Sequence, residues 1–234
     1  AYDLGYVVAA DVIERTTRTL ATMDRMQRYR GHFYNWYDTL SLEPLRPMYV
    51  STVDSGNLSG HLLTLAAGLD ELEGHVIVCP QLFRGLGETL DVISEATSTW
   101  PEAVRAVTYL RAELRQSPKL PSEAFALLQR FTTKAAVLER AVTARGAVEP
   151  TWWATALVAQ CNRAIGELTT MLPWLELPPA EDPAVRAKLD GALTLHALAR
   201  LEIQGPPSAA LQDAAALATE RAALRVEQLR ALAM

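Results

Sequence analysis

The side chains best suited to chemistry lie near the start of the chain, in residues 31–61, which read GHFYNWYDTLSLEPLRPMYVSTVDSGNLSGH. The stretch has no helical or strand period, and it is too aromatic for a disordered segment, so we expect an ordered loop. Sugar rings stack their C–H faces on aromatic rings, and their hydroxyls hydrogen-bond to carboxylates, amides and imidazoles. The residues therefore favour a carbohydrate site, with aromatic packing in a core as the alternative. The side chains behind this prediction are Phe33, Tyr34, Trp36, Tyr37 and Tyr49, with His32, Asn35, Asp38 and His61.

Two aspartates in this stretch are candidates for acid/base catalysis. Glycoside chemistry uses paired carboxyl groups that flank the bond being broken, and Asp38 and Asp54 are the pair to test first. The alternative is structural, with Asp54 capping a helix and Asp38 accepting hydrogen bonds within the loop. The spacing of His32, His61 and Asp54 matches no metal-binding pattern, so we expect no metal. We also expect no cofactor, because RGLGE at residues 84–88 is a weak phosphate-loop pattern within a helical stretch and no βαβ pattern exists.

Composition limits the classes of partner. The chain has 234 residues, of which 50% are hydrophobic and 21% charged, as in an ordinary globular protein. Its formal net charge is 22 − 27 = −5, which argues against nucleic acid or an anionic membrane surface as the main partner. No apolar run reaches the ~18 residues of a membrane span, so we expect no span in this segment. Cys79 and Cys161 form no ligand set with histidine.

The loop must be held by the elements on either side of it. Apolar residues at three- and four-residue spacing predict a helix over residues 3–29, with Gly31 as its C-terminal stop. Pro44 and Pro47 exclude helix from the loop. The β-branched and aromatic residues at positions 48–53 predict an extended, strand-like piece.

The rest of the chain reads as one helix after another. A helix over residues 56–73 is capped by Asp54 or Ser55. Further helices are expected over residues 81–98, 101–116, 121–146, 150–171, 183–203 and 208–233, the last two separated by Gly205-Pro206-Pro207. This order predicts an all-α fold, an incomplete α/α toroid with one long ordered aromatic loop. The expected parts are residues 1–80 with the loop, residues 81–176 with helical hairpins of the same domain, and residues 177–234 with the closing helices.

Trp152 and Trp153 open the helix expected over residues 150–171. Two adjacent indoles at a helix start can anchor the helix against its neighbours, or they can form a second stacking surface for a sugar. The sequence leaves both interpretations open.

The aromatic stretch resembles a segment of the bacterial cyclic β-1,2-glucan synthases that reads GH-aromatic-x-NWYDT, then LEPL, then YVSTVDSGNLxGHL. The preceding AYDLGYV and RTLATMDRMQRYRGHF are also similar to that family. The resemblance is specific over residues 1–73 and general afterwards. Leu40 and Met48 depart from the pattern, because the family tends to carry arginine there, and this change weakens one expected contact to the substrate or its surroundings.

The resemblance implies a large inner-membrane enzyme with several modules. A glycosyltransferase module extends a β-1,2-glucan from UDP-glucose, a glycosidase-like α/α-barrel module cyclises it by transglycosylation, and a phosphorylase-like module trims it. This chain resembles the N-terminal part of the cyclising module, on the cytoplasmic side of the membrane. Its implied partners are a β-1,2-glucan chain and other modules of the same polypeptide, and the catalytic carboxylates are expected downstream. The residues implied to line the glucan cleft are Trp36, Tyr37, Asp38, Asp54, Ser55 and Asn57.

Two alternatives stay open. The first is a non-catalytic helical scaffold in which the aromatic loop packs against a partner module. The second is a self-sufficient β-glucan hydrolase with Asp38 and Asp54 as the working pair. An incomplete toroid would expose an apolar face, which predicts self-association of the isolated chain.

Overall fold

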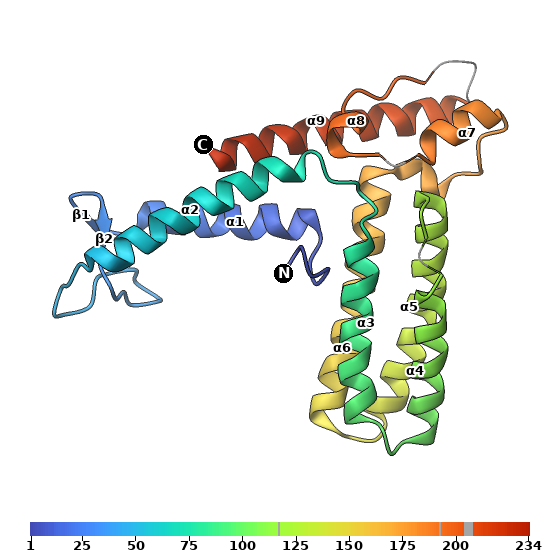
Figure 1. Cartoon of the computed structure of the whole chain (residues 1–234), viewed down its shortest axis with the longest axis horizontal. Helices are drawn as coiled ribbons and strands as arrows, with labels where there is room; N and C mark the ends of the chain where they lie inside the picture. Colours follow the sequence, from blue (N-terminus) through green and yellow to red (C-terminus); the bar gives the residue numbers. More distant parts are fainter. Residues whose placement is uncertain (117, 192, 204–207) are drawn as a thin grey trace.

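The computed structural model describes residues 1–116, 118–191, 193–203 and 208–234, and these residues are mostly helical. Figure 1 shows an L-shaped molecule, in which an arm extends from the upper end of an upright helical bundle. Within the described ranges, sheet is confined to one short two-stranded hairpin. The all-α prediction is confirmed. The toroid, and the expected divisions near residues 80 and 176, stay predictions.

The upright part of the L is a four-helix bundle made of α3 (Pro80–Ala96), α4 (Pro101–Leu114), α5 (Pro121–Thr143) and α6 (Val148–Met171). Three of these helices start on a proline, which lacks the N–H that would have no partner in a first turn. Helices α3 and α5 each pack against both α4 and α6. The largest fully buried side chains of the bundle are Leu86, Leu90, Ile93, Leu110, Leu127, Leu128, Phe131, Leu138, Leu157, Leu168 and Met171. Burial of these apolar side chains stabilises the bundle.

Short elements cross the upper end of the bundle, namely η1 (Pro173–Glu176), α7 (Pro183–Leu189) and α8 (Leu195–Leu198). The single helix expected over residues 183–203 is therefore wrong. The expected helix is interrupted between α7 and α8 because this part of the chain pairs with a segment that is distant in the sequence. There, Ile77 N donates to Leu193 O at 2.9 Å. The expected Gly205-Pro206-Pro207 break lies outside the described residues.

The last helix, α9 (Ala209–Ala233), joins the arm to the bundle. It packs along α2 and α8 and also contacts α1, η1 and α6. Arg230 donates two hydrogen bonds to the Glu73 carboxylate, at 2.8 and 2.9 Å. Arg225 forms an ion pair with Glu167 of α6 in which both side chains are mostly buried. These contacts fasten α9 to both parts of the L.

The arm is built from α1 (Ala9–Arg25) and α2 (Thr52–Leu72). Its buried apolar side chains include Ile13, Leu69 and Leu72, which belong to the hydrophobic core that continues into the bundle. The other residues of α2 are half-buried or exposed. The far end of the arm therefore receives little stabilisation from burial.

The chain leaves α1 through a tight hairpin, in which β1 (Arg28–Tyr29) pairs with β2 (His32–Phe33). Helix α1 is shorter at both ends than the helix expected over residues 3–29. Gly31 does not stop that helix. It lies in the hairpin turn with φ of 88°, next to Arg30 with φ of 50°. Two consecutive positive φ angles are those of a type I′ turn, which glycine adopts readily.

The start of α2 also differs from the prediction. Residues 48–50 form no strand, and the helix begins at Thr52. The capping residue is Ser51 rather than Asp54 or Ser55, because the Ser51 Oγ accepts a hydrogen bond from Asp54 N at 3.1 Å. Asp54 lies three residues after the cap, where a carboxylate favours the positive end of the helix dipole.

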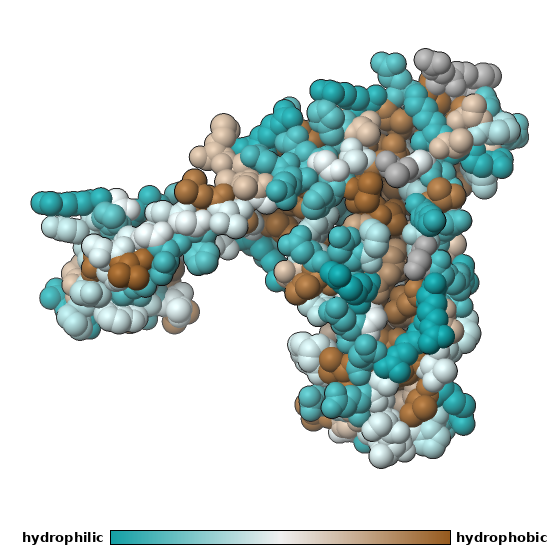
Figure 2. All heavy atoms as spheres, viewed as in Figure 1, coloured by the Kyte–Doolittle hydropathy of each residue, from teal (hydrophilic) through white to brown (hydrophobic). Residues whose placement is uncertain are grey.

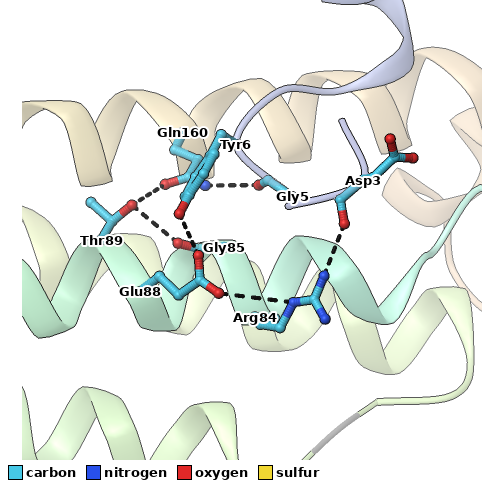
Figure 3. A network of polar contacts seen from close by, with 8 residues as sticks. All are labelled: Asp3, Gly5, Tyr6, Arg84, Gly85, Glu88, Thr89 and Gln160. Atoms are coloured by element: carbon cyan, nitrogen blue, oxygen red, sulfur yellow. Dashed lines mark hydrogen bonds and ion pairs between the residues drawn. The ribbon is translucent and has the colours of Figure 1, made fainter. Parts of the chain in front are cut away.

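The N-terminal segment holds the root of the arm on the bundle, as Figure 3 shows. Gly5 and Gly85 touch so closely that a methyl group on Gly85 would lie 2.5 Å from Gly5 O. The RGLGE stretch therefore serves a packing contact. Further hydrogen bonds across this arm root run from Gln160 Nε2 to Gly5 O (2.8 Å), from Arg84 Nη2 to Asp3 O (2.9 Å), and from the Tyr6 hydroxyl to Glu88.

Candidate functional site

The aromatic loop lies at the far end of the arm, and Asn35 closes it. Asn35 N donates to Tyr49 O at 2.9 Å, and Asn35 Oδ1 accepts from Ser51 N at 2.9 Å. Its Nδ2 donates to Asp54 Oδ2 at 2.8 Å. One side chain thus ties the start of the loop to its end and to the first turn of α2. We refer to these contacts as the Asn35 clasp.

Tyr37 supports the loop from inside. Its hydroxyl donates to Gln27 O at 2.6 Å and accepts from Tyr34 N at 2.8 Å. The Tyr34 and Tyr37 rings meet edge to face with centroids 6.3 Å apart. A β-bridge pairs Tyr37 with Pro44. Tyr37 therefore acts as a structural support for the loop, and its hydroxyl is already occupied.

Asp38 also holds the loop together. Its Oδ1 accepts hydrogen bonds from Leu40 N at 2.9 Å and Ser41 N at 2.7 Å. These hydrogen bonds, from Ser41 first and then Leu40, lower the pKa of the Asp38 carboxyl below its ordinary value. The side chain is therefore an ionised acceptor at neutral pH, as in the structural alternative from the sequence.

The loop presents two aromatic rings to solvent. Trp36 and Tyr49 are 54% and 55% exposed. Their rings stack with centroids 6.2 Å apart and an interplanar angle of 30°. The Asn35 clasp bonds directly to Tyr49 O, and Trp36 O accepts from Leu45 N at 3.0 Å, so the backbones under both rings are fixed. We refer to Trp36 and Tyr49 as the aromatic platform.

A cavity of about 440 Å³ lies between the hairpin and the first turns of α2. Five of the residues predicted for the site line it, namely His32, Phe33, Asn35, Asp54 and Ser55. Sequence reasoning missed Arg28, Leu58, Ser59 and Leu62 in its wall. The Arg28 guanidinium lies 4.7 Å from the centroid of the Phe33 ring, so a cation borders this cavity. In the sequence, the arginines just before the loop were the signal that could have indicated this cation.

Other predicted residues lie apart from this cavity. Asn57 is exposed on α2. His61 lines a separate cavity of about 570 Å³, which it shares with the N-terminal segment and the start of α1. The platform and the two supporting residues Tyr37 and Asp38 belong to the loop but not to the wall of the 440 Å³ cavity. The structure thus distributes the residues of the predicted segment among a platform, a cavity and internal supports, and their role in binding stays a prediction.

The described part of the chain holds no group of three or more histidine, cysteine or acidic side chains placed to bind a metal ion. His32 and Asp54 share a cavity, whereas His61 lines another. None of the described helices is long and apolar enough to cross a membrane.

Comparison with known proteins adds the functional context. No family model matches the chain. The chain is 33% identical to the cyclic β-(1,2)-glucan synthase NdvB of Rhizobium meliloti (strain 1021) over 186 aligned positions. The chain resembles a cyclic β-(1,2)-glucan synthase. This alignment covers 71% of the chain but only 7% of the length of NdvB, so the similarity concerns a small part of that enzyme.

Proposed function

We propose that this chain is part of a cyclic β-1,2-glucan synthase-like protein and that its arm tip binds β-1,2-glucan. The observation that supports this most is the aromatic platform, two stacked rings that are each more than half exposed and whose backbones are fixed by hydrogen bonds. The 33% identity to NdvB gives the ligand class, because a cyclic β-(1,2)-glucan is what that enzyme is named for making.

The geometry suits a sugar chain in two ways. A glucose ring stacks on Trp36 or Tyr49, and the neighbouring cavity offers hydroxyl, amide and carboxylate groups from Ser55, Asn35 and Asp54. The hydrogen-bonded loop is preorganised, so binding loses little conformational entropy. Holding one segment of a glucan in place raises the effective concentration of its end near an internal bond, which is what cyclisation by transglycosylation requires.

The bond-breaking step is assigned elsewhere in the longer protein. A retaining glycosidase mechanism needs two carboxyl groups about 5 Å apart, one of them a proton donor. Asp38 is fixed as an ionised acceptor by the backbone of its own loop, and Asp54 accepts a hydrogen bond from Asn35. Asp38 does not have the environment of a proton donor, so the hydrolase alternative with Asp38 and Asp54 as the working pair gains no support.

The scaffold alternative has one specific observation in its favour. Leu40 and Val53 at the arm tip, and Leu63 on α2, are 95%, 69% and 74% exposed. Figure 2 shows brown, hydrophobic atoms on the visible face of the arm. Exposed apolar side chains often cover a partner surface. Here the partner is another module of the same polypeptide, and the location proposed with it is the cytoplasmic side of the bacterial inner membrane.

Calorimetry with linear β-1,2-gluco-oligosaccharides separates these functions. Replacing Trp36 by alanine should weaken binding about tenfold, equivalent to about 1.4 kcal/mol, because it removes a stacking surface. Tyr109→Ala is the matched control, since Tyr109 is a similarly exposed aromatic residue on α4, far from the loop. Equal affinities of wild type and Trp36→Ala, with both proteins folded by circular dichroism, would contradict a glucan site on the loop.

A further inference from the structure

A third cavity lies at the arm root, where the N-terminal segment and α1 meet α3 and α6. Its volume is about 620 Å³, within the roughly 300–1,000 Å³ typical of ligand sites. Tyr6, Trp152 and Trp153 contribute its aromatic surface. We call it the corner groove. It shares no residue with the cavity at the arm tip.

The two tryptophans at the start of α6 have different surroundings. Trp153 is half-buried and packs against the hydrophobic core, so it anchors the helix. Trp152 is 62% exposed, and its ring meets the Trp153 ring edge to face, with centroids 4.6 Å apart. The anchored indole therefore holds the exposed one in place. Helix packing accounts for Trp153 but not for Trp152.

Polar side chains border the same groove. Figure 3 shows Tyr6 reaching Glu88, and Gln160 bonding to the N-terminal segment. Arg163 forms an ion pair with Asp11, with 2.8 Å between Arg163 Nη1 and Asp11 Oδ1. The guanidinium of Arg15, from α1, makes no hydrogen bond or ion pair with any residue that the structure describes. An exposed indole beside fixed carboxylate and amide groups and an unpaired guanidinium is the combination that sugar rings and their hydroxyls require.

We propose that the corner groove is a second glucan-binding subsite, in which Trp152 stacks on a sugar ring and Arg15 and Glu88 bind its hydroxyls. The proposal rests on the proposed function, because it takes the same ligand class. Two subsites on one L-shaped body would hold two segments of one long glucan. Binding at the second subsite then becomes intramolecular, which raises the affinity for long chains over short ones.

The groove is tested by itself in a background that lacks the platform. Short linear β-1,2-gluco-oligosaccharides are titrated calorimetrically into Trp36→Ala and into the double variant Trp36→Ala/Trp152→Ala. We expect residual binding in the first and a loss of about tenfold or more in the second. Trp36→Ala/Tyr109→Ala is the matched control and should bind like Trp36→Ala. Equal binding by the two double variants would overturn the proposal while leaving the arm tip as a site.

A second variant tests the polar contact. Arg15→Met keeps most of the side-chain length but removes the guanidinium, so a sugar site should lose affinity severalfold. A groove that takes only apolar groups would bind the oligosaccharides equally well after this change. That result would overturn the proposal. Conversely, if Trp152→Ala lowers the affinity for β-1,2-gluco-oligosaccharides and Trp36→Ala does not, the corner groove is supported as a glucan site and the aromatic platform is contradicted. The two proposals therefore fail separately.

Discussion

The two ends of the arm are both made by segments that are distant in the sequence, yet different physical forces hold them. At the root, Gly5 and Gly85 bring two backbones together with no space for a methyl group, next to the buried core of α3. At the tip, the Asn35 clasp joins the loop by hydrogen bonds among half-exposed residues. The root adds close backbone packing to its hydrogen bonds, whereas the tip lacks such packing and relies on hydrogen bonds, so substitutions at the two places should have different consequences.

The largest effect is expected at the root. Gly85→Ala places a methyl group against Gly5 O, so the N-terminal segment must move, and we expect the free energy of unfolding to fall by about 1–3 kcal/mol. Chemical denaturation measures this change. Gly87→Ala is the control, because the nearest atom to its added methyl group belongs to a Leu114 side chain at 3.8 Å. A Gly85→Ala protein as stable as Gly87→Ala would show that close packing does not hold the root.

A smaller and more local effect is expected at the tip. Asn35→Ala removes two side-chain hydrogen bonds, but the loop contributes little to the core, so global stability should change by less than about 1 kcal/mol. Hydrogen exchange of the Ser51 amide should accelerate, and glucan affinity should fall because the platform loses its support. Asn57→Ala, on the exposed surface of α2, is the comparison and should leave the Ser51 amide protected. Unfolding of the whole chain by Asn35→Ala would remove the distinction between root and tip.

The smallest effect concerns pH. The folded-state pKa of Asp38 is lowered, so its contribution to loop stability is present above its unfolded value and is lost as pH falls through the folded pKa. The amide resonances of Leu40 and Ser41 should therefore titrate with a midpoint below the ordinary value of 3.8. Nuclear magnetic resonance measures this midpoint. A midpoint at or above the ordinary value would mean that the Asp38 hydrogen bonds do not form in solution.

Local patterns predicted the individual helices of the bundle well, because the sequence signals for helices act over short distances. Prolines at positions 80, 101 and 121 mark helix starts, and the helical period marks the buried faces. Gly31 was misread because a glycine with positive φ serves equally well after a helix and in a hairpin turn. Ser51 was overlooked as the cap although a serine three residues before an aspartate is a capping pattern.

The candidate site could be predicted as a segment but not as a geometry. The aromatic and polar composition of residues 31–61 singles this segment out as a candidate. Composition does not reveal that Tyr37 and Asp38 make hydrogen bonds that support the loop, whereas Trp36 faces solvent. The contact between Gly5 and Gly85 spans about 80 residues and has no local pattern, so the arrangement of the arm required the structure.

Helix α9 has a mechanical consequence. It lies against α2 in the arm and against α6 and η1 in the bundle, with charged pairs at Glu73 and Glu167 along its length. Because α9 contacts both the arm and the bundle, it resists changes in the angle between these two parts of the L. The aromatic loop is therefore held at a fixed distance from the bundle.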